Sequence, residues 1–368
     1  MANLDKYLVP SKKISVMGSF LPLKDTLGMN LVTNDYQVAI LGAPMVSGDH
    51  TDSGLSTDAI RKQLYELSSA FKNIRIADLG DVRCDSERGA SYALTETIRE
   101  LTEANVITIV LGGSHELTEC MVDGIERKKE KLRLTIIDSK IDVRDTSEKT
   151  AHAFVGHLLE NSQLDELNLL GLQNYYCSEE QVRVLRDREC CCMRLRDLRG
   201  KTVVAEPLLR DSEVFSFDFS AVRQSDALDR RMMIPNGFSS LEACELAHYA
   251  GLSDCIQTYG LFGYDSELNA DSQTAALAAQ MVWHILKGID NRYHDYPYKD
   301  ISEYKKYIIF PKVEGEDAVY FYHNILNGRW WVEIPTLKGK ELFSCSPSDY
   351  QNMLDGAIPD IWMKHFMK

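Results

Sequence analysis

The sequence predicts an α/β fold: a three-layer α/β/α domain with about eight mainly parallel strands, followed by a small C-terminal α+β subdomain. Short apolar runs alternate with amphipathic segments of helical length from about residue 34 to residue 290. This alternation is typical of a parallel sheet with helices on both faces. Polar and acidic residues follow several of the apolar runs, where the strands would end. After Asp290 the pattern changes to dense aromatic residues with two-residue alternation, which indicates β-strands of a different kind.

The first strand is expected where Tyr36 begins an apolar run that ends at Gly42. Ser56 or Thr57 can cap the next helix, because apolar residues then recur at helical spacing. Each later strand is likewise a short apolar run followed by a helical pattern. The expected strands cover residues 36–41, 74–79, 106–111, 132–137, 167–172, 190–195, 214–217 and 255–262. After a first helix near residues 57–67, the expected helices cover residues 90–104, 117–127, 151–159, 179–187, 241–249 and 272–288.

Three parts are expected: an N-terminal leader packed on the core (1–33), the α/β domain (34–290) and a C-terminal α+β extension (291–368). In the extension, Asn327-Gly328 separates two alternating aromatic runs, which predicts a hairpin with a tight turn. A terminal helix is expected from about Asp349. The aromatic residues could form a partner surface or cover one end of the main sheet. The second role is favoured because sheet edges are usually protected.

Composition excludes several classes of protein. The net charge of −14 would repel nucleic-acid phosphate and anionic lipid, so neither a nucleic-acid nor a membrane partner is expected. The N-terminus has no apolar core segment of a signal peptide, and nine scattered cysteines fit reduced thiols, so we expect a cytoplasmic protein. Cys190, Cys191 and Cys192 lack C-x-x-C spacing and are expected in the core of a short strand rather than in a zinc site.

Four side chains that can bind a metal follow three of the expected strands: His115, then Asp138 and Asp142, and far downstream Asp218. The carboxyl ends of parallel strands lie along one edge of a sheet, so these side chains could converge there. Hard divalent ions favour carboxylate and imidazole ligands. Each aspartate alone also fits a helix cap or a loop residue, which is the commoner role. The glycines before His115 do not complete a dinucleotide-binding motif or a P-loop.

Residues 112–115, 138–142 and 216–220 together resemble the motifs of the ureohydrolases, the family of arginase, agmatinase and formimidoylglutamase. That family carries Gly-Gly-x-His, Asp-x-His-x-Asp and Ser-x-Asp-x-Asp at successive strand ends. The resemblance covers about residues 35–289 and is nearest to a divergent formimidoylglutamase-like branch because of residues 217–226. Supporting stretches occur at residues 77–81, 171–173, 235–237 and 271–275. The resemblance implies an arginase-like fold and a homo-oligomer.

The family uses two manganese ions, which share bridging carboxylates and hold a hydroxide that attacks a guanidino or formimino carbon. The resemblance implies that the first ion would be held by a complete set of ligands: His115, Asp138, Asp142 and Asp218. The second ion would need a histidine at position 140 and an aspartate at position 220. This chain has Lys140 and Ser220 there, so the second half of the site is replaced.

Lys140 suggests how the replaced half is compensated. A protonated ammonium group cannot bind a metal, but it can stand where a cation stood. One divalent ion and Lys140 would supply +3 against the −3 of Asp138, Asp142 and Asp218. We therefore expect either one divalent ion, with manganese first, or no metal at all, with Lys140 in place of the second ion. Inherited scaffolding, with Lys140 salt-bridged to the aspartates, is the plainer alternative.

Two further catalytic positions also depart from the family pattern. Gly263 falls where the family has an acidic residue that grips the substrate cation, and Asp265 could substitute from two positions on. His152 falls near the family's proton-shuttling histidine, although a structural histidine fits that place equally well.

Two functions follow from these observations. The first is a family member with weak or no classical hydrolase activity that binds a small guanidino or formimino ligand or a partner protein. The second is an active one-metal hydrolase of a guanidino or formimino C–N bond, with Lys140 in the site. Loss of two metal ligands and of the substrate acid favours the first, because a second ion supplies several kcal/mol of transition-state stabilisation.

Overall fold

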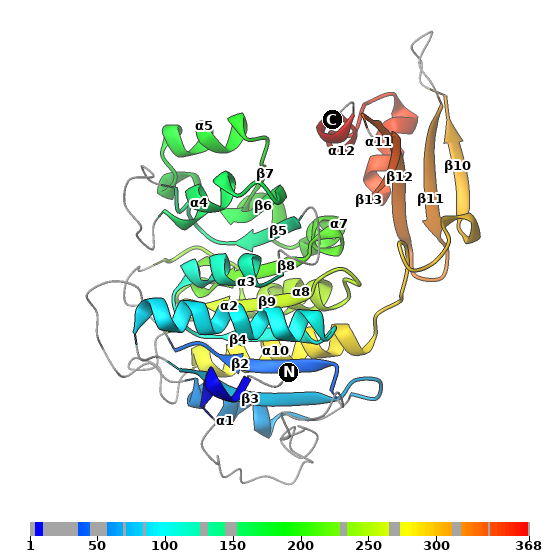
Figure 1. Ribbon diagram of the computed structural model, residues 1–368. Coiled ribbons are helices and arrows are strands. Elements are labelled where there is room, and N and C mark those ends of the chain that lie inside the picture. The colour runs from blue at the N-terminus through cyan, green and yellow to red at the C-terminus, as the bar shows by residue number, and fades with distance from the viewer. Residues whose placement is uncertain are drawn as a thin grey trace.

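A computed structural model describes most of the chain, and its central feature is a nine-stranded sheet (Figure 1). The described residues are 4–9, 36–44, 57–68, 71–83, 86–125, 132–143, 153–228, 234–264, 273–310, 318–337 and 339–366. All neighbouring strands of the sheet are parallel except β1, which pairs antiparallel with β3. In spatial order the strands are β1 (Leu8–Val9), β3 (Ile76–Val82), β2 (Val38–Gly42), β4 (Ile107–Leu111), β9 (Thr258–Phe262), β8 (Val214–Asp218), β5 (Leu132–Ile137), β6 (Leu164–Leu172) and β7 (Cys191–Arg194).

Helices cover both faces of this sheet, and each face has its own apolar core. The helices on one face are α1 (Asp58–Glu66), α6 (Leu195–Leu198), α7 (Glu206–Asp211), α8 (Ser240–Gly251) and α10 (Gln273–Asp290). Those on the other face are α2 (Glu87–Glu103), α3 (Thr118–Ile125), α4 (Phe154–Glu160) and α5 (Glu179–Asp187). The predicted three-layer α/β/α architecture is therefore confirmed.

Local sequence explains how tightly α8 and α10 pack. Ser239 and Glu242 form a capping box that satisfies free backbone N–H groups at the start of α8. At its end, Gly251 meets Gly288 of α10, and a Cβ atom at Gly288 would lie 2.6 Å from the carbonyl carbon of Gly251. The two helices can approach this closely only because both residues lack a side chain. No helix in the described part of the chain is long and apolar enough to cross a membrane.

Two details of the sheet differ from the sequence expectations. The strand β1 was not predicted, because its two residues are too few to show alternation. The expectation of core cysteines was wrong for Cys192, whose side chain is exposed. The reason is that β7 is the last strand of the sheet and has one free edge, so its residues are only partly covered.

The C-terminal extension forms a separate four-stranded antiparallel sheet with two helices on one face (Figure 1). The predicted hairpin is confirmed, but its expected tight turn is wrong: Asn324 pairs with Arg329, so residues 325–328 form a longer loop, in which Gly328 has a φ of +78° that glycine adopts without strain. The elements are β10 (Lys305–Ile309), β11 (Val319–Asn324), β12 (Arg329–Thr336), β13 (Gly339–Cys345), α11 (Pro347–Asp355) and α12 (Asp360–His365).

This extension packs against the edge of the main sheet where the strands begin. Arg210, just before β8, donates hydrogen bonds to the carbonyl groups of Trp330 and Cys345. Lys364 pairs with Glu166 near the start of β6 at 2.6 Å. The extension therefore covers the amino ends of the central strands, opposite the edge where their carboxyl ends lie.

Candidate metal centre

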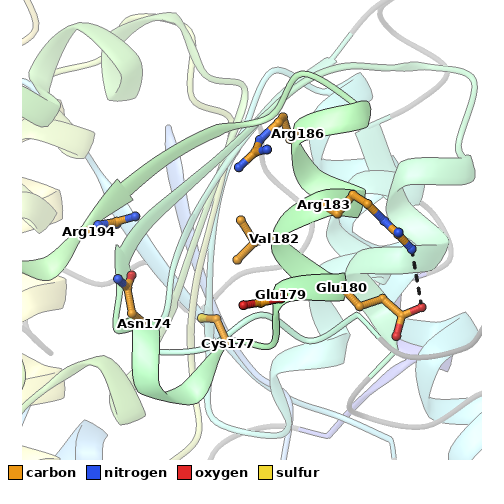
Figure 2. A pocket seen from close by; sticks show the side chains of 8 residues that line it. All are labelled: Asn174, Cys177, Glu179, Glu180, Val182, Arg183, Arg186 and Arg194. Carbon is orange, nitrogen blue, oxygen red and sulfur yellow. Dashed lines mark ion pairs between the residues drawn. The ribbon is translucent and has the colours of Figure 1, made fainter.

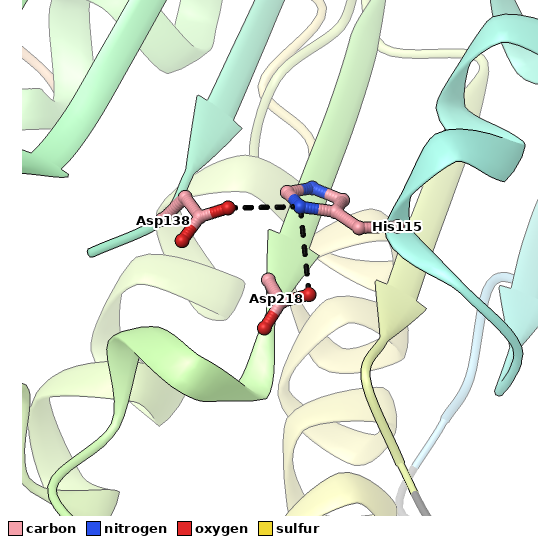
Figure 3. Close-up of side chains that lie close together, drawn as sticks. All are labelled: His115, Asp138 and Asp218. Atoms are coloured by element: carbon pink, nitrogen blue, oxygen red, sulfur yellow. Dashed lines mark hydrogen bonds and ion pairs between the residues drawn. The ribbon is translucent and has the colours of Figure 1, made fainter. Parts of the chain in front are cut away.

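Three of the four expected metal ligands meet at the carboxyl edge of the sheet (Figure 3). His115 follows β4 and begins a short 3₁₀ turn, Asp138 follows β5 directly, and Asp218 is the last residue of β8. The strands β4, β9, β8 and β5 are consecutive neighbours in the sheet, which brings the three side chains together from distant parts of the chain.

The three side chains form a compact buried cluster. His115 Nδ1 lies 3.0 Å from Asp138 Oδ2 and 3.5 Å from Asp218 Oδ2. One ligand atom from each residue can be chosen so that all three lie within 4.8 Å of one another. The rings of Phe154 and Phe262 lie beside the imidazole and help to exclude water. The donors are one nitrogen and two carboxylate oxygens, which suit a divalent ion such as Mn²⁺.

The electrostatics of the cluster show an excess of negative charge. Burial lowers the pKa of His115, but the hydrogen bond with Asp138 and the charges of Asp218, Asp138 and Asp142 outweigh it and raise the pKa overall. Burial raises the pKa of Asp138, and the nearby charge of Asp218 adds to this, although His115 opposes it. The carboxylates of Asp138 and Asp218, which offer ligand atoms within 4.8 Å of one another, repel each other and would be stabilised by a shared cation.

Ser216 orients the imidazole ring, a role that the sequence analysis missed. Its Oγ lies 3.0 Å from His115 Nε2 and 2.6 Å from Thr118 Oγ1. Nε2 can donate its proton to Ser216, and Nδ1, which lies within hydrogen-bonding distance of Asp138, would exchange its own proton for a bound ion. The signal was available, since Ser216 lies two residues before Asp218 and therefore on the same side of β8.

The Oδ1 atoms of Asp138 and Asp218 accept hydrogen bonds from other groups of the chain. Ser220 Oγ donates to Asp138 Oδ1 at 3.1 Å, and the Ser220 amide donates to Asp218 Oδ1 at 2.7 Å. The Lys140 amide also donates to Asp138 Oδ1, at 3.2 Å. The Oδ2 atoms of both aspartates face His115, while the Oδ1 atoms face Ser220 and the Lys140 backbone.

The two remaining charged residues form a pair beside the cluster. Lys140 Nζ lies 3.1 Å from Asp142 Oδ1, and Asp142 is not part of the three-residue cluster. Burial lowers the pKa of Lys140, but Asp142, Asp138 and Asp218 together raise it. The ammonium group therefore stays protonated and neutralises Asp142.

The positions expected to act in catalysis have different outcomes. Gly263 lies against Asp218, and a Cβ atom there would come within 2.9 Å of the carboxylate. Its φ of +80° also disfavours any other residue, so this position has no room for a substrate-binding acid in its present conformation. His152 and Asp265 lie outside the described residues, and their roles stay predictions.

Three of these residues fit a divalent ion. His115, Asp138 and Asp218 would hold it, and Ser216 would fix the imidazole. Such an ion acts as a Lewis acid and lowers the pKa of a bound water.

Comparison with known proteins identifies the family from which this arrangement comes. Residues 36–287 match the profile of the arginase family, which is well over half of the chain. The chain belongs to the arginase family. It is 22% identical to guanidinobutyrase of Pseudomonas aeruginosa over 278 residues, a match that covers 67% of this chain and 85% of that enzyme. It is also 29% identical to formimidoylglutamase of Citrobacter koseri over 124 residues, covering 31% of this chain and 40% of the relative.

Solved structures of this family show the same fold. Formiminoglutamase of Trypanosoma cruzi, solved with Mn²⁺, superimposes with a TM-score of 0.68 at 20% identity and covers 74% of this chain and all (100%) of that one. Formimidoylglutamase of Bacillus subtilis gives a TM-score of 0.67 at 19% identity and covers 80% of this chain and 100% of that one. Family relatives thus bind Mn²⁺, and this arginase-family chain retains a buried cluster capable of binding a metal.

Proposed function

We propose that this arginase-family protein binds one divalent ion, with manganese preferred, and has weak or no activity as a classical two-metal hydrolase. The ion would be held by His115, Asp138 and Asp218. The observation that carries the proposal is that the two oxygens of each carboxylate, in Asp138 and in Asp218, have different partners. The two Oδ2 atoms face the histidine, while Ser220 and the Lys140 backbone donate to the Oδ1 atoms, on the side where a second ion would lie.

Charge balance supports the same stoichiometry. Asp138 and Asp218 carry −2, which one divalent ion neutralises, while Lys140 and Asp142 neutralise each other at 3.1 Å. A second divalent ion would bring excess positive charge next to the Lys140 ammonium, which a buried site disfavours. The function that remains is recognition: a small guanidino or formimino compound, as the names of the family relatives suggest, would be bound rather than cleaved.

The proposal is tested by incubating the purified full chain with Mn²⁺ and agmatine, 4-guanidinobutyrate or N-formiminoglutamate. We expect no release of urea, formamide or ammonia above the level of buffer with Mn²⁺. Steady release from any of these compounds would contradict the proposal and favour the alternative, an active one-metal hydrolase.

A paired variant tests the assignment of positions without relying on activity. Lys140→His with Ser220→Asp supplies the two missing ligands, so bound Mn²⁺ should rise from one ion per chain to two. The matched control, Lys140→Met with Ser220→Ala, removes the same side chains without supplying ligands and should bind no more than one. If the repaired chain gains no second ion, these positions do not form the other half of the site.

A further inference from the structure

A hollow opens between α5, the loop after β6 and the end of β7 (Figure 2). Its volume is about 940 Å³, and it is open to solvent. Asn174 and Cys177 contribute from the loop, Glu179 and Val182 from α5, and none of the four residues of the expected metal site lines it. The hollow is therefore a separate site and has to be explained by its own side chains.

Two arginines from different elements converge on this hollow. Arg186 comes from the last turn of α5 and Arg194 from the last position of β7, and both guanidinium groups point into the same space in Figure 2. Within the described part of the chain, neither forms an ion pair. Arg183 also lines the hollow, but its guanidinium group turns toward Glu180 and forms an ion pair with that carboxylate at 4.0 Å (Figure 2).

The whole chain carries a net charge of −14, so two arginines that line one hollow depart from its overall charge balance. Single exposed arginines commonly remain solvated, but two that face one concave space create a local positive potential. The planar guanidinium group binds a carboxylate through two parallel hydrogen bonds, which makes arginine the usual partner of small carboxylates.

The other lining residues limit the kind of ligand. Val182 offers an apolar surface between the arginines and Glu179, which a short aliphatic chain can cover. Glu179 carries a negative charge, so the hollow does not suit a strongly polyanionic ligand. We propose that this hollow binds a small aliphatic carboxylate through Arg186 and Arg194.

The wall of the hollow is also tied to the metal-site loop. Gln181 of α5 donates from Nε2 to the carbonyl groups of Ile141 and Val143, at 2.8 and 2.9 Å. These two residues flank Asp142, the partner of Lys140. A carboxylate held on α5 would therefore lie next to the loop that carries this ion pair, while remaining outside the metal cluster.

Isothermal titration of the full chain with glutarate tests the proposal. We expect measurable binding that weakens about tenfold or more in Arg186→Gln and in Arg194→Gln, because each loses a charge-assisted hydrogen-bonding group. Glu179→Gln should bind glutarate more tightly, since it removes a negative charge from the hollow. Damage to the fold would not produce that gain. Arg196→Gln is the matched control, because Arg196 is exposed, pairs with Asp197 at 3.5 Å and does not line the hollow. The affinity of the Arg196→Gln variant for glutarate should equal that of the wild type.

Three results would overturn the proposal. One is no heat of binding with millimolar glutarate. Another is an equal loss in Arg196→Gln, which would indicate only general attraction by charge. The third is equal binding of 1,5-diaminopentane, which has the same chain length as glutarate and carries ammonium groups instead of carboxylates.

Discussion

The candidate metal centre differs from a second buried cluster, which we call the joint and in which Arg329 of the C-terminal extension pairs with Asp295 and Glu206. Both clusters contain groups of opposite charge, but their carboxylates have different partners. At the joint, the Asp295 side chain is almost fully buried and accepts four hydrogen bonds from the chain itself. The donors are Tyr304 (2.8 Å), Asn324 (2.7 Å), Asn327 (2.7 Å) and Arg329 (3.3 Å). At the metal centre, Asp138 is buried as deeply and its Oδ1 accepts from Ser220 and the Lys140 amide, but its Oδ2 faces the imidazole of His115, which also lies 3.5 Å from a second carboxylate, Asp218.

The difference is visible in the direction of the pKa shifts. Burial raises the pKa of Asp295, but the hydrogen bonds from Tyr304, Asn327 and Asn324 and the charge of Arg329 lower it overall. The pKa of Asp138 is raised. Asp295 lies beside a cation of the chain, Arg329, whereas Asp138 lies near a second carboxylate, Asp218, and such a pair of carboxylates is suited to bind a cation from outside.

The largest expected effect is at the joint. Arg329→Met should reduce the free energy of unfolding by about 3–5 kcal/mol, because it leaves Asp295 buried without its cation and removes one of the two arginines that pair with Glu206. Urea denaturation followed by tryptophan fluorescence measures this, since Trp330 and Trp331 lie in the same extension.

Lys340→Met is the control for Arg329→Met, because its pair with Glu333 is at the surface, with the Lys340 side chain 61% exposed. It should cost less than about 1 kcal/mol. Equal effects of the two substitutions would show that the joint is no more important than a surface ion pair.

An intermediate effect is expected from Lys140→Met in the metal-centre loop. The substitution removes the ammonium group that pairs with the buried Asp142 at 3.1 Å, and we expect a loss of about 1–3 kcal/mol in the same denaturation experiment. The loss should be smaller than that of Arg329→Met because the Lys140 side chain is 22% exposed. A loss as large as that of Arg329→Met would mean that the two clusters do not differ as described.

The smallest effect is a pH dependence at the joint. Because the pKa of Asp295 is lowered from 3.8, its contribution to stability is complete above that pH and is lost as pH falls through the folded-state pKa. The stability difference between wild type and Asp295→Asn should be constant above about pH 5 and should shrink below pH 3.8, by at most about 1.4 kcal/mol per pH unit. A difference that stays constant down to pH 2 would show that Asp295 is not stabilised as an anion.

Much of the fold was predictable because alternation of buried strands and amphipathic helices directly reflects a covered parallel sheet. The convergence of His115, Asp138 and Asp218 was predictable for a related reason, since each follows a strand of that sheet. The strand β1 and the exposure of Cys192 were not, because they depend on which strand lies at an edge.

Other features needed the three-dimensional structure. Sequence spacing does not show that Ser220 donates to both aspartates or that Lys140 turns toward Asp142, since these depend on side-chain direction within loops. Sequence spacing also does not show that Arg186, from a helix, and Arg194, from a strand, line one hollow, because this depends on how α5 packs on the sheet.

The central claim is that the site holds one divalent ion, and a count of bound metal tests it most directly. Full-length protein purified without chelator would be dialysed against Mn²⁺, and bound metal per chain measured by elemental analysis, with Asp218→Asn as the variant that lacks a ligand. We predict one ion per wild-type chain and at least a tenfold weaker site in Asp218→Asn. Two ions per wild-type chain, or none, would contradict the account.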